Sequence, residues 1–106
     1  MNMDEKVLFP CPYLNDNVVF TPERHAHILE EHANVIAKGN ELLQTALLDP
    51  IQVRLRPTGS LLFVIQVRQI FLVVAVNKIK RDNIYKIMTA YFARKLSKED
   101  NVLWEK

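Results

Sequence analysis

The spacing of apolar residues along this chain changes from a helical period to a strand period near residue 50. Between Thr21 and Ala37 the spacing is helical. Thr21 is suited to cap this helix, Pro22 to begin its first turn, and Gly39 to end it. The apolar stripe of this predicted helix is made of Ile28, Leu29, Ala33, Val35 and Ile36.

The sequence on either side of this helix is less regular. A second, shorter helix is predicted from about Glu41 to Leu48, and Asp49-Pro50 ends it. Residues 1–17 show no sustained period, because the short apolar run Val7-Leu8-Phe9 is interrupted by Pro10-Cys11-Pro12. We therefore expect an irregular N-terminal segment.

From Ile51 onward the apolar residues alternate with a period of two. In the segment 51–56 this alternation directs Val53 toward the core and both Arg54 and Arg56 toward solvent. Further strands are predicted at 61–67, 70–76 and 84–92. The second of these is apolar on both faces, which is typical of a central strand. A basic loop follows it at 77–83, and the tail at 93–106 is compatible with a short helix or with disorder.

This order of elements predicts an α+β fold, in which two N-terminal helices pack on one face of a roughly four-stranded antiparallel sheet. A chain of 106 residues has the length of one domain. If Met88 and Phe92 face the helices, the residues expected on the open face are Tyr85, Thr89, Tyr91, Arg54 and Arg56. Aromatic and guanidinium groups of this kind suit a single-stranded RNA surface, although Tyr and Thr are also simply favoured in strands.

Charge is distributed unevenly along the chain. Residues 1–50 carry three Lys/Arg against eight Asp/Glu, a net charge of −5. Residues 51–98 carry ten Lys/Arg against one Asp, a net charge of +9, and the last eight residues carry −2. A basic half of a small domain indicates a polyanionic partner such as nucleic acid, or else an ordinary solvated sheet surface.

All three histidines, His25, His27 and His32, lie in the predicted first helix. His25 and His32 are separated by roughly 10 Å of helical rise, too far for both to bind one metal ion directly. With one cysteine in the chain, we expect no metal site and no cofactor. Proton chemistry near neutral pH is one interpretation of the histidines. The other, which stays open, is one hydrogen-bonded core histidine with two on the surface.

Several short segments resemble one family of nucleases. They are Thr21-Pro-Glu-Arg-His-Ala-His-Ile28 followed by His32, Leu48-Asp49-Pro50, the strand Phe71–Val76, and Thr89-Ala90-Tyr91. In order and spacing these segments resemble the phage and mobile-element nuclease domains of the barnase–EndoU–colicin D–RelE-like (BECR) superfamily. The resemblance covers about Val18 to Tyr91. The chain departs from that pattern at Glu31, where a second Arg is common, and at Ala33-Asn34, which replace Pro-Glu.

The resemblance implies a toxin-like, metal-independent endoribonuclease, which attacks the phosphate with the ribose 2′-OH and leaves a 2′,3′-cyclic phosphate. The implied catalytic residues are His32, His27, Thr89 and Arg24. The residues expected to bind RNA are Arg54, Arg56, Arg68, Tyr91 and Lys78. Other interpretations stay open for three residues: Thr89 and Tyr91 as plain strand residues, and Arg68 as a turn residue. His25 is expected to be structural.

The implied partners are RNA, either tRNA or mRNA, and a cognate antitoxin or immunity protein. The single cysteine and the lack of a secretory leader lead us to expect a cytoplasmic protein with no membrane association. The alternative is a catalytically degenerate module of the same fold that binds RNA or protein without cleaving it.

Overall fold

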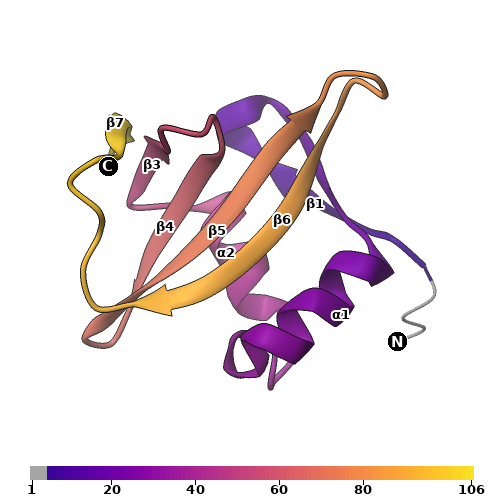
Figure 1. The fold of residues 1–106 in the computed structure, drawn as a ribbon, viewed down its shortest axis with the longest axis horizontal. Helices are drawn as coiled ribbons and strands as arrows, with labels where there is room; N and C mark the ends of the chain where they lie inside the picture. Colours follow the sequence, from indigo (N-terminus) through magenta and orange to yellow (C-terminus); the bar gives the residue numbers. More distant parts are fainter. Residues whose placement is uncertain (1–4) are drawn as a thin grey trace.

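One mixed sheet of seven strands organises the chain in the computed structural model, which describes residues 5–106 (Figure 1). The strand order across the sheet is β1-β2-β6-β5-β4-β3-β7. The strands are β1 (Val7–Cys11), β2 (Asp16–Phe20), β3 (Gln52–Leu55), β4 (Leu61–Val67), β5 (Ile70–Ile79), β6 (Ile84–Ala93) and β7 (Asn101–Glu105). The helices are α1 (Pro22–Glu31) and α2 (Glu41–Leu48), with 3₁₀ turns η1 (Pro12–Leu14) and η2 (Ala33–Val35).

The expected sheet of about four antiparallel strands is therefore wrong. The α+β class and the two helices are observed, but β1 and β7 come from segments expected to be irregular or a tail, and β2 begins at the end of the segment expected to be irregular. The sheet is also mixed, because β2 pairs in parallel with β6 while every other neighbouring pair is antiparallel.

The N-terminal strands form in spite of the prolines. β1 is an edge strand, where a proline does not interrupt a ladder on both sides, and Pro10 lies opposite Asn17 of β2. The expectation of an irregular segment at 1–17 is thus wrong for the part from Val7 onward, and residues 1–4 lie outside the described part. Cys11 is buried at the end of β1, and this burial raises the pKa of its thiol.

The main core lies between the sheet and the helices. α2 packs on β1, β4 and β5, and α1 lies alongside β6 (Figure 1). The fully buried side chains that fill this core include Phe20, Ile28, Leu43, Leu47, Phe63, Leu72 and Ile87. The radius of gyration is 12.9 Å, close to the roughly 13 Å expected of a compact domain of about 100 residues. Within residues 5–106, no helix has the length and apolar character needed to cross a bilayer.

The first helix ends earlier than its apolar stripe predicts. Thr21 caps it as expected, since its hydroxyl accepts a hydrogen bond from the Arg24 backbone N–H at 3.2 Å. At the other end His32 leaves the helical conformation, with φ −143° and ψ 52°. The chain then continues in η2, which buries Val35, while Leu29 of the expected stripe remains 53% exposed.

A β-bulge in β6 decides which side chains face the helices. Ala75 lies opposite Thr89 and Val76 opposite Ile87, so that Met88 is an extra residue on β6. Before the bulge Tyr85 and Ile87 face the helices, and after it Ala90 and Phe92 do. Thr89 and Tyr91 consequently lie on the opposite face, as expected. Tyr85 was also expected there, and that expectation is wrong.

The C-terminal segment crosses the sheet and is not a free tail. β7 adds to the outer edge of β3, so the chain between β6 and β7 passes the three strands that separate them (Figure 1). On the way Leu96 packs against a second, smaller core on the face opposite the helices, which is formed by Leu62, Val64, Val73 and Ala75.

Arg54 holds this segment in place. Its guanidinium donates to the Gln52 side-chain oxygen at 2.8 Å and to the Ser97 backbone carbonyl at 2.7 Å, and its Nε lies 3.7 Å from the Asp100 carboxylate. The side chains of Arg54 and Asp100 are only 10% and 8% exposed. The expectation that Arg54 faces solvent is therefore wrong, because the C-terminal segment covers this part of the sheet.

We predict that Arg54→Ala lowers the free energy of unfolding by about 3–5 kcal/mol, because it leaves the buried Asp100 carboxylate without its cation. The matched control is Arg94→Ala, at an exposed position of the C-terminal segment, which should change stability by about 0.5 kcal/mol or less. Urea unfolding followed by circular dichroism measures both. Equal effects of the two substitutions would contradict the structural role of Arg54.

Candidate active site

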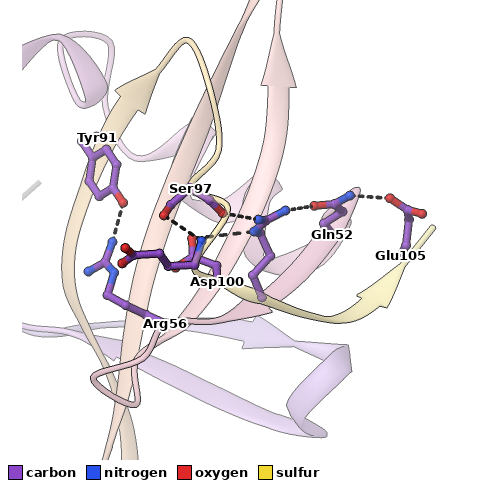
Figure 2. A network of polar contacts seen from close by, with 8 residues as sticks. Gln52, Arg56, Tyr91, Ser97, Asp100 and Glu105 are labelled. Atoms are coloured by element: carbon purple, nitrogen blue, oxygen red, sulfur yellow. Dashed lines mark hydrogen bonds and ion pairs between the residues drawn. The ribbon is translucent and has the colours of Figure 1, made fainter.

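Three elements distant in sequence bring His32, Tyr91 and Arg56 together. The His32 and Tyr91 rings have centroids 5.9 Å apart at an interplanar angle of 45°. Arg56, which follows β3, donates a hydrogen bond to the Tyr91 hydroxyl, and its guanidinium carbon lies 5.8 Å from the centre of that ring (Figure 2). The His32 imidazole and the Arg56 guanidinium thus both contact Tyr91.

The position of His32 follows from how α1 lies against β6. β2 pairs with β6 only at Tyr85 and Lys86, which leaves the later part of that edge of β6 open to α1. The Arg24 guanidinium donates from Nη1 to the Met88 carbonyl at 3.1 Å, so it binds the backbone of the bulge. Its Nε lies 3.4 Å from the Glu23 carboxylate. The hydrogen bond from Arg24 to the Met88 carbonyl fixes α1 along this edge of β6 and directs the last turn of the helix toward Tyr91.

Thr89 contributes a hydroxyl that has no hydrogen-bond partner among the described residues. Its Oγ1 is buried, and buried hydroxyls are ordinarily hydrogen-bonded. Thr89 is two residues before Tyr91 on the same face of β6, and this spacing separates the two side chains by about 7 Å. Because this oxygen is buried, a ligand could contact it only after the side chains around it move.

The structure does not bring every predicted site residue to this place. Within residues 5–106, His27 is half-buried on α1, and no hydrogen bond, ion pair or ring contact of its side chain is present. Arg68 lies in the turn between β4 and β5 with φ 60°, as its interpretation as a turn residue requires. Lys78 lies near the opposite end of β5, 5.3 Å from the centre of the Tyr85 ring.

Two further predictions concern His25 and metal ions. The His25 ring lies 5.7 Å from the Phe20 ring, next to the core, which agrees with a structural part for this residue. In the part of the chain that the structure describes, no three His, Cys, Asp or Glu side chains are grouped so that they could hold a metal ion.

The sequence interpretation missed the residues of the C-terminal segment. A cavity of about 350 Å³ lies beside the Arg56–Tyr91 pair, and Lys95, Leu96 and Ser97 form part of its wall. Figure 2 shows Ser97 and Asp100 next to that pair. The run Val102-Leu103-Trp104 was the available signal, because β-branched and aromatic residues favour a strand over a disordered tail.

Comparisons with protein-family models, with curated protein sequences and with solved structures give no significant match for this chain. The resemblance to the BECR nucleases therefore rests on the short motifs given above.

The contact between His32 and Tyr91 can be tested without any substrate. Tyr91→Leu removes the ring current acting on His32, so the His32 ring protons should change chemical shift while those of His27 stay in place. Tyr91→Phe keeps the ring and should preserve the His32 shifts. Tyr85→Leu, on the helix side of β6, is the matched control. Unchanged His32 shifts in Tyr91→Leu would place the two rings apart in solution.

Proposed function

We propose that this chain is a metal-independent endoribonuclease whose active site is formed by His32, Tyr91 and Arg56. Thr89 lies on the same face of β6 as Tyr91, and Arg24 holds the helix that ends at His32 against the bulge of β6. The observation that carries the proposal is the contact of the His32 ring with the ring of Tyr91, whose hydroxyl is bound by Arg56. An imidazole, the side chain most often used in acid–base catalysis, thus contacts a phenol that a permanently charged guanidinium binds.

The reaction needs three chemical contributions. A base takes the proton of the ribose 2′-OH, and the 2′-oxygen attacks the neighbouring phosphorus. The bond from phosphorus to the 5′-oxygen breaks, an acid gives that oxygen a proton, and a 2′,3′-cyclic phosphate remains. Positive charge stabilises the pentacoordinate phosphorus between these events.

The residues present match these contributions. His32 is the proposed base or acid, and Arg56 the proposed source of positive charge. The proposed partner in proton transfer is the Tyr91 hydroxyl, which accepts a hydrogen bond from Arg56. His27 is left out of the site, because it contacts none of these three residues. Thr89 is two residues before Tyr91 on the same face of β6, and its buried hydroxyl is unpaired, so we assign it a positioning part beside Tyr91. We leave Arg54 out of this site, because its donors are used within the fold.

The proposed substrate is RNA, either tRNA or mRNA, held mainly by the basic half of the chain. We further propose a cytoplasmic location, in which the single buried Cys11 stays reduced. A cognate acidic antitoxin or immunity protein would compete with RNA for the same positive surface.

A second candidate function has its own observation. β7 is an edge strand whose Val102, Leu103 and Trp104 are 44%, 42% and 39% exposed. An exposed apolar edge of this kind can pair with a strand of another protein. This favours the alternative in which the chain is a binding module without catalysis.

Cleavage in the absence of metal tests the proposed function. Purified protein, incubated in EDTA with tRNA and mRNA, should release fragments that end in 2′,3′-cyclic phosphate. His32→Ala should slow this cleavage by about 10²–10⁴-fold, the usual contribution of acid–base catalysis, and leave RNA affinity within a few-fold. End-group analysis and fluorescence anisotropy measure the two quantities.

His25→Ala is the matched control, because it removes a histidine of the same helix that packs on Phe20. With its fold intact by circular dichroism, it should cleave at nearly the wild-type rate. Cleavage that requires a divalent metal, or that is equal in wild type and His32→Ala, would contradict the mechanism. RNA binding without any cleavage would favour the binding module instead.

A further inference from the structure

The cavity beside the Arg56–Tyr91 pair has walls of two kinds. Its floor is the second core on the face opposite the helices, where Leu62 and Val73 are each 2% exposed. Leu96 of the C-terminal segment lines it as well and packs against the same core. Apolar groups therefore come to this cavity from the sheet and from the segment that crosses it.

The rim of the cavity is polar and positively charged. Arg56 and Lys95 line it together with Tyr91, so the cavity opens where the proposed reaction takes place. Glu99 and Asp100 line it as well, and the Asp100 carboxylate is paired with Arg54, which leaves Arg56 and Lys95 as the cations toward the Tyr91 side. The backbone next to it is held firmly, since the Ser97 carbonyl accepts from Arg54 and the Ser97 hydroxyl accepts from the Glu99 backbone N–H at 3.2 Å. A ligand in this cavity would contact a backbone that is already ordered, which lowers the entropy lost on binding.

This combination fits a planar apolar group that carries a negative charge at one end. A volume of about 350 Å³ is at the lower limit of small-molecule sites, which range from about 300 to 1,000 Å³. A nucleobase has apolar faces and polar edges, and in single-stranded RNA it is commonly held by aromatic and guanidinium groups. Its phosphate would lie toward the cations at the rim.

We infer that this cavity is a subsite for one unpaired RNA nucleotide, with its base against the apolar wall that Leu62, Val73 and Leu96 form together and its phosphate at Arg56 and Lys95. The inference rests on the proposed function and adds the substrate class: RNA that is single-stranded next to the cleaved bond. It also makes the C-terminal segment part of the substrate site, held there by the buried contact of Arg54 with Asp100.

The test uses the four 3′-nucleoside monophosphates and inorganic phosphate as probes, titrated into the whole protein and followed by NMR and calorimetry. At least one nucleotide should bind more tightly than phosphate and shift the resonances of Leu96 and Tyr91. Leu96→Ala should weaken that binding by about tenfold, since it removes an apolar wall. Leu42→Ala is the matched control, because Leu42 is half-buried and lines a different cavity.

Ala93→Phe, which fills the cavity from its rim, provides a second variant if Leu96→Ala does not fold. Equal binding of all four nucleotides and phosphate, or shifts confined to other surfaces, would overturn the inference. So would equal losses in Leu96→Ala and Leu42→Ala. Nucleotide binding here without RNA cleavage would support the subsite and reject the proposed function. Cleavage in EDTA without nucleotide binding would reject the subsite alone.

Discussion

The extra residue Met88 in β6 is the constraint on which the candidate site depends. One additional residue reverses the alternation of a strand, so Ile87 and Ala90 both enter the main core while Thr89 and Tyr91 face the other way. The carbonyl of the same residue accepts the hydrogen bond from Arg24 that holds α1 along the edge of β6. The bulge therefore orients the strand residues of the site and also positions the helix that carries His32.

The second constraint is the buried contact of Arg54 with Asp100 and Ser97. A charged pair with this little exposure gains only modest net stability, but leaving one partner alone in the interior costs a great deal. The C-terminal segment is therefore fixed over the sheet, and β7 is aligned with β3. In this way the sheet gains its last strand and the candidate site gains a wall.

Local patterns predicted the parts of the fold that local chemistry decides. The Thr21 cap, the second helix at 41–48 and the apolar strand from Ile70 are observed nearly as predicted, because capping, helical period and continuous apolarity act within a few residues. The β1 and β7 strands were missed, because their pairing with β2 and β3 is a tertiary contact that a proline or a polar surrounding obscures.

The same distinction holds for the candidate site. His32, Thr89 and Tyr91 were predicted from motifs, and the direction of Thr89 and Tyr91 follows from alternation after the bulge. The direction of Arg54 was wrong, since alternation alone cannot show that a distant segment covers a strand face. The part of Lys95 and Leu96 in the site could not be predicted locally, because they lie near Tyr91 only when the C-terminal segment crosses the sheet to pair β7 with β3.

The most direct measurement of the central claim is the position of an uncleavable RNA on the protein. A short single-stranded RNA with 2′-O-methyl riboses lacks the attacking hydroxyl, so it should remain bound, and its contacts can be mapped by NMR chemical shifts. We expect the largest changes at His32, Thr89, Tyr91 and Arg56. Changes confined to the exposed edge of β7 or to α2, with His32 and Tyr91 unaffected, would contradict the assignment of an active site to this face.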